Sequence, residues 1–363
     1  MKLIVKRIVA AITFLCILLT LITKAGFLVR PLEVDADNMS YLYKEDKNSM
    51  NVVCVGSSAM YRFWIPQQAY MEQQFTSSLI STASQNIDTV PYLMEEVEKT
   101  QDVDLFVVEI RSIISEEVRI NKGTEKTEVL LSRLGYTAMG MKQSLNRIQL
   151  IDHLLKEDEE NTKLEWMIPI LKYHDNIHKM SADQLTDRLN GIGKDEIYTK
   201  LTYMVTPQKK HAFKSNTDVM LSDEAKDSID NVIEKANELG AHVLLIATPY
   251  IPTKTRGALQ LQMNDYIRQQ GYDYLDMTDK YDEIGLNLKT DFYDKNHMNI
   301  SGAKKVTRYM AAYISDNYKL SHLLNTEQEQ RWMKICDAWQ KEEKELSDLW
   351  QQEIDQGVDH EKK

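Results

Sequence analysis

The sequence predicts an α/β protein with a doubly wound, mainly parallel sheet in a three-layer αβα arrangement, a helical insertion and an N-terminal transmembrane helix. Three observations support this prediction. Short runs rich in Val, Ile and Leu alternate with amphipathic helical patterns, which is typical of strands buried on both faces of a parallel sheet. One long, polar and mostly helical stretch interrupts this alternation, and a strongly apolar run lies near the start of the chain.

Length and charge exclude one broad class of function. The chain has 363 residues, which is enough for one large or two ordinary domains with a proper core. Its formal net charge is −11 at pH 7, whereas nucleic-acid binding needs an excess of Lys and Arg over the contact face. We therefore expect no nucleic acid as a partner.

Residues 1–30 are predicted to form a signal anchor, because an apolar run from Ile8 to Ile22 follows the basic residues Lys2, Lys6 and Arg7. The run is somewhat short for a hydrocarbon core of ~30 Å and overlaps the length of a signal peptide. The following stretch, "TKAGF", is a poor match to a cleavage site. We therefore favour an uncleaved single-pass anchor over a cleaved signal. The remainder is then extracytoplasmic and starts with an exposed linker at residues 31–50.

The α/β domain is predicted over residues 51–320. Its expected strands are the runs "NVVCVG", "SSLISTA", "DLFVVEIR", "HVLLIATP" and "YDYLDM". Its expected helices include "TVPYLMEEVEKTQ", "SDEAKDSIDNVIEKANELG", "TRGALQLQMNDYIRQQG" and "SGAKKVTRYMAAYISDNY". Gly240 and Gly271 end two of these segments, where a glycine commonly terminates a helix. This alternating order predicts helices on both faces of one sheet.

Residues 112–221 form the predicted helical insertion. An insertion after a central strand is expected over the carboxyl ends of the strands, where doubly wound folds bind ligands. It is therefore either a lid over the site or a packing subdomain.

Residues 321–363 are predicted to form an amphipathic helix and a polar tail. Apolar residues recur there at helical spacing, namely Trp332, Ile335, Trp339, Leu346 and Leu349. Such a stripe either packs on its own domain or docks on a partner or the membrane surface.

Candidate catalytic residues follow the first predicted strand and precede the last predicted helix. Ser58 comes directly after "VCVG", where Gly56 permits a tight turn, and Asp294 and His297 lie three residues apart in "DFYDKNHMN". A serine nucleophile needs an imidazole base and a carboxylate that holds the base in the correct tautomer. The alternative is a turn serine and a loop whose Asn299 or Ser301 caps the last helix.

These blocks resemble a known family. "NVVCVGSSAM" is similar to the nucleophile block of the SGNH/GDSL esterase and acyltransferase superfamily, and "DFYDKNHMN" is similar to its closing Asp-x-x-His block. "STASQNIDT" and "DLFVVEIRS" stand where the family has its second block and third strand, and the likeness runs from about Asn51 to Tyr318. The closest likeness is to the membrane-anchored branch that includes the D-alanyl transfer protein of teichoic acid alanylation and the acetylation proteins of exopolysaccharides.

The resemblance implies an SGNH-like fold and a role for each matching residue. Ser58 is the expected nucleophile, His297 the general base and Asp294 the residue that orients it. Ser57 takes the place of the aspartate in the family's Gly-Asp-Ser motif. The backbone N–H of Ser58 and an N–H near Gln85 are the expected oxyanion donors. Losing one such donor typically lowers the rate ~10²–10³-fold.

One departure from the family pattern concerns the third block. The family usually has Gly-x-Asn-Asp there, with the asparagine in the oxyanion hole, whereas this chain has "VVEIRSI". Arg111 is either a cationic oxyanion donor or, with Glu109, one half of a buried structural pair. The membrane-anchored branch also lacks the motif, and the resemblance implies transfer of a small acyl group for its members.

We expect no cofactor and no metal. The chain has no Gly-rich phosphate loop, His174 and His178 lack the intervening Glu of a zinc protease motif, and Cys16, Cys54 and Cys336 are too scattered for a disulfide framework or zinc cluster.

The expected function is that of an extracytoplasmic, membrane-anchored serine esterase or O-acyltransferase that acts on a cell-envelope polysaccharide or a teichoic-acid-like polymer. The resemblance further implies a membrane-bound O-acyltransferase as partner. The alternative is a non-catalytic polymer-binding protein or an assembly subunit of an acylation complex.

Overall fold

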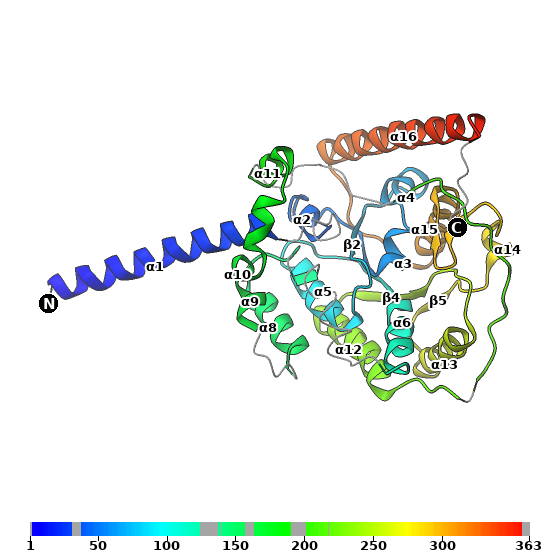
Figure 1. Cartoon of the computed structure of the whole chain (residues 1–363), viewed down its shortest axis with the longest axis horizontal. Coiled ribbons are helices and arrows are strands. Elements are labelled where there is room, and N and C mark those ends of the chain that lie inside the picture. Colours follow the sequence, from blue (N-terminus) through cyan, green and yellow to red (C-terminus); the bar gives the residue numbers. More distant parts are fainter. Residues whose placement is uncertain are drawn as a thin grey trace.

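Five parallel strands form the central sheet in the order β2-β1-β3-β4-β5 (Figure 1). They are β1 (Val52–Gly56), β2 (Ser77–Ser81), β3 (Leu105–Glu109), β4 (His242–Ala247) and β5 (Tyr274–Asp276). Every residue of β1, β2 and β3 is buried, as expected for a parallel sheet that is covered on both faces. All five strands fall within the predicted runs, so the α/β prediction with a mainly parallel sheet is confirmed.

The computed structural model describes residues 2–30, 38–123, 137–138, 140–156, 163–189, 201–216 and 218–357. The chain moves from β1 outward to β2 and then back past β1 to β3. The strand order therefore reverses between β1 and β3, and such a reversal places a crevice at the carboxyl ends of the strands.

Helices cover both faces of the sheet (Figure 1). On one face, α4 (Pro66–Gln73) packs against α15 (Ile300–Asn317) and α16 (Thr326–Asp355). On the other face, α5 (Val90–Glu98) packs against α12 (Asp223–Leu239), and α13 (Lys254–Gln270) packs against α6 (Arg111–Ile120). Gly240 and Gly271 end α12 and α13 in the left-handed conformation, with φ of 73° at each, as predicted.

The N-terminal apolar run is part of a longer helix than the Ile8–Ile22 run that the sequence analysis singled out. Helix α1 (Lys2–Val29) has 28 residues, which corresponds to a length of about 42 Å. By length and composition, Leu3–Val29 is able to cross a membrane. Residues 31–37 of the predicted linker lie outside the described residues, and α2 (Asn38–Leu42) occupies part of the rest.

Helix α6 covers the first residues of the predicted insertion and packs on α13, so it belongs to the layer that covers the sheet. The other described helices of the insertion lie beside α1 and α5. They are α8 (Leu145–Leu154), α9 (Lys163–Met167), α10 (Pro169–Tyr173), the 3₁₀-helix η3 (His174–His178) and α11 (Ala182–Leu189). Helix α8 packs against α5, while α10, η3 and α11 contact α1. These helices therefore pack around the base of α1 and form no lid (Figure 1). Other parts of the insertion, namely 124–136, 139, 157–162, 190–200 and 217, lie outside the described residues.

The first half of α16 packs on its own domain. Trp332, Ile335 and Trp339 are buried, and the Trp332 ring stacks on that of Tyr70 in α4 with centroids 5.1 Å apart. Leu349, farther along the same helix, is 56% exposed. The packing alternative therefore holds for the first half of the predicted stripe. Residues 358–363 of the predicted tail lie outside the described residues.

Candidate active site

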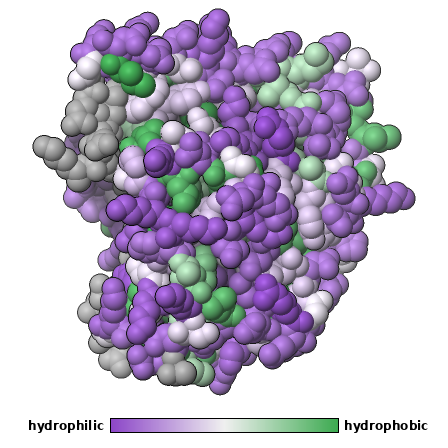
Figure 2. Space-filling view, turned by 90° about the vertical axis from the view of Figure 1, so that its right-hand side faces the viewer, coloured by the Kyte–Doolittle hydropathy of each residue, from purple (hydrophilic) through white to green (hydrophobic). Residues whose placement is uncertain are grey.

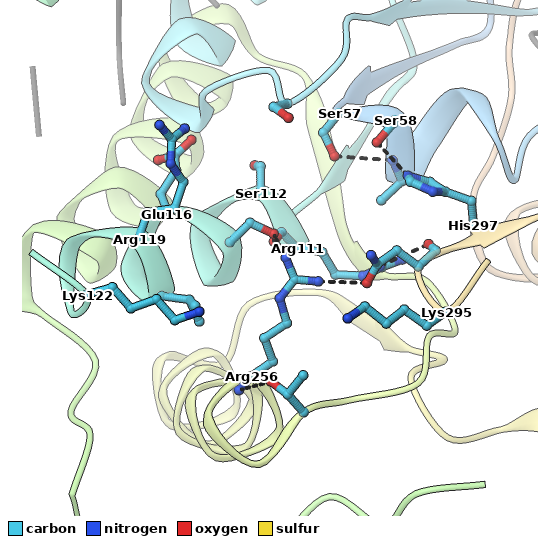
Figure 3. A pocket seen from close by; sticks show the side chains of 16 residues that line it. Ser57, Ser58, Arg111, Ser112, Glu116, Arg119, Lys122, Arg256, Lys295 and His297 are labelled. Carbon is cyan, nitrogen blue, oxygen red and sulfur yellow. Dashed lines mark hydrogen bonds between the residues drawn. The ribbon is translucent and has the colours of Figure 1, made fainter. Parts of the chain in front are cut away.

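Ser58, His297 and Asp294 form one continuous hydrogen-bonded chain. Ser58 Oγ lies 2.8 Å from His297 Nε2 (Figure 3). His297 Nδ1 lies 3.0 Å from both carboxylate oxygens of Asp294. The three residues predicted to be catalytic are thus brought together, although Ser58 and His297 are 239 positions apart in the chain.

The turn after β1 presents Ser58. At Gly56, a Cβ atom would lie only 2.7 Å from the Cβ of Glu109, so β3 approaches too closely for any side chain. Ser57 then caps the short helix α3 (Ser58–Tyr61) by accepting a hydrogen bond from the Ala59 N–H. Because Ser58 is the first residue of α3, its own N–H has no acceptor within the helix. That N–H is therefore free to act as the predicted oxyanion donor.

A small hairpin presents the histidine and the aspartate. Asp294 ends β6 (Phe292–Asp294) and His297 starts β7 (His297–Met298), the two antiparallel strands of this hairpin. The N–H of Asn296 donates to Asp294 Oδ1 at 2.7 Å and fixes the turn between them. Asn299 caps α15 through the N–H of Gly302, as the capping alternative predicted, so the loop has both features at once.

The charge on Asp294 suits an orienting role. Burial alone would raise its pKa, but the hydrogen bond and the charge of His297 outweigh this effect and hold the pKa at about 2. The carboxylate is therefore ionised at neutral pH and accepts the proton on His297 Nδ1. The other ring nitrogen, Nε2, is then free to accept the hydroxyl proton of Ser58, which is the arrangement of a serine nucleophile with its general base.

Arg111 connects the two loops that carry these residues. Its Nη1 donates to Thr248 Oγ1 at 2.8 Å and its Nη2 donates to the carbonyl oxygen of Asn296 at 3.1 Å. The Thr248 hydroxyl in turn donates to the carbonyl oxygen of Ala59, next to the nucleophile, at 3.1 Å. One guanidinium group thereby bridges the serine turn and the histidine hairpin, and both of its terminal nitrogens already have acceptors.

Glu109 and Arg111 are both buried, as the structural-pair interpretation expected. The hydrogen bond between them is not an ion pair, however, since Glu109 Oε1 accepts the backbone N–H of Arg111 at 2.9 Å. The second carboxyl oxygen accepts the Ser57 hydroxyl at 3.2 Å. Burial raises the pKa of Glu109 to about 7, against the opposing charge of Arg111. Glu109 therefore supports the turn that carries Ser58 by accepting the hydroxyl of Ser57.

The prediction for Gln85 needs a correction. The backbone N–H of Gln85 donates to the Thr82 carbonyl at 3.1 Å, and its buried side chain accepts the N–H of Thr82 at 3.0 Å. Both groups are thus used within the loop after β2, and Gln85 does not line the pocket beside Ser58. Ser84 does line it, with a φ of 53° that residues other than glycine rarely adopt. A serine carries no sequence signal for that conformation.

A pocket of about 510 Å³ opens beside Ser58 and His297 and is strongly basic. Five basic residues line it, with Glu116 as the only acidic one: Arg111, Arg119, Lys122, Arg256 and Lys295 (Figure 3). Among the described residues, Arg119, Lys122 and Lys295 form no ion pair. A cluster of unpaired positive charge in a protein of net charge −11 favours an anionic ligand. Four of the five could not be predicted from the sequence, because they come from three separate segments.

Of these four residues, Lys295 lies in the turn of the histidine hairpin and Arg256 contacts that turn. Arg256 Nη1 donates to Asn296 Oδ1 at 2.7 Å and its Nη2 donates to Ser115 Oγ at 3.1 Å. Within the described ranges, no group of three or more His, Cys, Asp or Glu residues is arranged to hold a metal ion.

No protein-family model matches the chain, and a search of the curated proteins found no match. Any inference about the chemistry of the site therefore depends on its own residues and their geometry.

Proposed function

We propose that the protein is a membrane-anchored, extracytoplasmic serine esterase or O-acyltransferase of the SGNH type, which acts on acyl groups of cell-envelope polymers. The observation that carries the proposal is the continuous contact from Ser58 through His297 to Asp294, at 2.8 Å and 3.0 Å. The apolar helix α1, which is long enough to cross a membrane, supports the anchored location. The sequence blocks that resemble the superfamily support the family.

The proposed reaction starts when Ser58 Oγ attacks the carbonyl carbon of an ester and His297 Nε2 takes the hydroxyl proton. The Ser58 N–H, with the N–H of Ser84 as the second donor, stabilises the resulting oxyanion. Collapse of the tetrahedral intermediate leaves an acyl group on Ser58, and His297 returns the proton to the departing alcohol. A water molecule or a hydroxyl group of the polymer then attacks the acyl-enzyme, with His297 again as the base.

The basic pocket supports an anionic polymer as the substrate. Its volume of about 510 Å³ lies within the usual range of small-ligand sites, and Lys122 and Lys295 bring positive charges to its wall. Phosphate or carboxylate groups on neighbouring repeat units fit this charge, as in a teichoic-acid-like polymer or an acidic polysaccharide. The proposal also includes a membrane-bound O-acyltransferase as the partner that supplies the acyl group, as the resemblance implies.

The proposal is tested with a fluorophosphonate, which labels activated serines, followed by mass spectrometry of the full-length protein in detergent. We expect one adduct on Ser58, its loss in Ser58→Ala and a much slower reaction in His297→Ala. Ser112→Ala is the matched control, because Ser112 lines the same pocket without contacting His297. A folded wild-type protein that forms no adduct, or forms it on another residue, would contradict the proposal.

Non-catalytic polymer binding is the second candidate, and the basic pocket is the observation that favours it. It gives no role to the Ser58–His297 contact. A polymer-binding protein should therefore bind an anionic polymer equally well in the wild type and in Ser58→Ala, and neither form should release or transfer an acyl group.

A further inference from the structure

The insertion holds the carboxyl end of helix α1. The last carbonyl groups of a helix accept no hydrogen bond from within the helix and need donors from elsewhere. Here Arg188 Nη1 donates to the carbonyl oxygens of Leu28 and Arg30 at 2.7 Å and 2.8 Å, and Asn176 Nδ2 donates to that of Val29 at 3.0 Å. Donors from α11 and η3 thus replace the missing turn, and α1 is joined to the insertion by direct hydrogen bonds.

Close packing reinforces this junction. A Cβ atom at Gly26 would lie 3.3 Å from Cδ of Pro169, so α10 lies tightly against the helix at that point. The side chain of Arg30 is 1% exposed, and its guanidinium carbon lies 3.8 Å above the centre of the Phe27 ring. The direction in which α1 leaves the domain is therefore set by packed side chains.

The free part of α1 has the length of a bilayer core. Every residue from Leu3 to Leu21 is exposed, and burial against the insertion begins at Ile22. At ~1.5 Å per residue, this exposed part is about 29 Å long, and the hydrocarbon core of a bilayer is ~30 Å thick. If α1 spans the membrane, the insertion starts at the depth where the hydrocarbon ends and the lipid headgroups begin.

Exposed apolar side chains gather on the helical elements around this junction. We define the collar as residues 163–189, which comprise α9, α10, η3 and α11 and lie around the base of α1 in Figure 1. Each of these four elements exposes one large apolar side chain: Leu164 by 58%, Leu171 by 48%, Ile177 by 47% and Leu189 by 63%. Single exposed apolar residues are ordinary, but four beside a membrane-spanning helix are typical of an interfacial surface.

Basic residues accompany these apolar side chains. Lys172 and Lys179 lie on or next to the same elements, and Lys172 Nζ lies 4.3 Å from the centre of the Trp166 ring. The collar also carries the acidic residues Glu165, Asp175 and Asp183, so the lysines do not make it strongly basic. Lysines next to exposed leucine and isoleucine are the combination that suits lipid headgroups, since the apolar chains enter the interface while the ammonium groups meet phosphates.

We propose that the collar rests on the outer surface of the bilayer that α1 spans, with Leu164, Leu171, Ile177 and Leu189 in the headgroup region. This inference depends on the proposal that α1 is a membrane anchor. Its consequence is a fixed orientation. The carboxyl ends of the strands lie on the side of the domain away from α1 (Figure 1), so the pocket beside Ser58 faces the envelope. The face opposite α1 is mainly hydrophilic (Figure 2).

The test uses the full-length protein in vesicles of phosphatidylglycerol and phosphatidylethanolamine. Cys16 is replaced by alanine, while Cys54 and Cys336 are buried and stay in place. Single cysteines at Ile12, Ile177 and Met220 carry a fluorescent label, and lipids with a quencher near the headgroup or deep in the acyl chain are added. Met220 is the matched control, because it is an apolar residue, 69% exposed, that precedes α12 on the side of the strands' carboxyl ends.

We expect the deep quencher to remove the fluorescence at Ile12 and the headgroup quencher to remove it at Ile177, with no loss at Met220. If Ile12 is quenched while Ile177 behaves like Met220, the anchor stands and the collar proposal is wrong. If the headgroup quencher removes the fluorescence at Ile177 and at Met220 alike, the proposed orientation is wrong. If Ile12 is not quenched at all, the membrane anchor itself is wrong, and the collar proposal fails with it.

Discussion

Arg111→Lys tests whether one buried guanidinium keeps the nucleophile and its base in register. Arg111 donates to Thr248 on one side and to the Asn296 carbonyl on the other, 2.8 Å and 3.1 Å away. A lysine ammonium is a single point on a flexible chain and does not reproduce a planar group that reaches two acceptors. The substitution keeps the positive charge beside Glu109 but breaks one of the two links.

The size of the effect follows from the broken link. A hydrogen bond to a charged group contributes about 1.5–3 kcal/mol. If this free energy holds the hairpin of His297 in its reactive position, its loss reduces the reactive population about 10- to 100-fold, since each ~1.4 kcal/mol corresponds to a factor of ten.

The assay measures the rate of fluorophosphonate labelling of Ser58 against pH, with thermal unfolding as a check on folding. Arg256→Lys is the matched control, because its hydrogen bond to the histidine hairpin, at 2.7 Å, goes to the side chain of Asn296 and not to the backbone, so the substitution is expected to have the smaller effect. Thr248→Val removes the opposite end of the same bridge and should lower the rate in the same direction. A folded Arg111→Lys variant that is labelled at the wild-type rate would refute the bridging role.

Three further predictions concern charge. Asp294→Asn removes the carboxylate that holds the imidazole tautomer and should lower the labelling rate of Ser58 by about 10³- to 10⁴-fold without unfolding the domain; a rate within tenfold of wild type contradicts the role of Asp294. Because the folded-state pKa of Glu109 is raised from 4.5 to about 7, the unfolded state loses its proton first, and stability falls as pH rises through this range, by up to about 3 kcal/mol. The free energy of unfolding of Glu109→Gln, measured with urea, should fall less between pH 5 and pH 8 than that of the wild type. An equal fall in both proteins contradicts the raised pKa of Glu109. Arg119→Gln with Lys122→Gln should raise KM for an anionic ester about 3- to 10-fold and leave a neutral ester unaffected, since charged contacts at partly exposed sites are modest; equal effects on both esters would count against an anion-binding pocket.

The sheet and the three catalytic candidates were accessible from sequence because their signals are local. Runs such as "VVCVG" are apolar on both faces, and a parallel sheet places the carboxyl ends of its strands at one edge. That rule places Ser58, which follows β1, at this edge. Asp294 and His297 belong to the separate β6–β7 hairpin before α15, and their signal was the short Asp-x-x-His block.

The basic pocket was not accessible in this way. Arg119 and Lys122 come from α6 and the turn after it, and Arg256 comes from the start of α13. Only the packing of α6 against α13 puts these charges beside one another, and no spacing within the chain encodes it. A charged residue on a helix is usually a solvated one, so each of them is unremarkable by itself.

The conformation of the loop after β2 and the position of the insertion were hard to predict from the sequence for a related reason. Which residue of a tight loop points into a pocket depends on single backbone dihedrals, and the positive φ at Ser84 moves that position one residue from Gln85. The insertion is polar and helical whether it covers the site or not. Its position beside α1 depends on contacts such as that of Arg188 with Leu28, 160 positions away.

The most direct test of the central claim is to observe an acyl group on Ser58. The full-length protein is mixed rapidly with an activated acetyl ester, quenched in acid before the steady state and digested for mass spectrometry. We predict one acetyl group on Ser58 in the wild type, none in Ser58→Ala, and faster loss of the group when a hydroxyl-bearing polymer is added. An unmodified Ser58 in protein that has nevertheless hydrolysed the ester would contradict an acyl-enzyme at this residue.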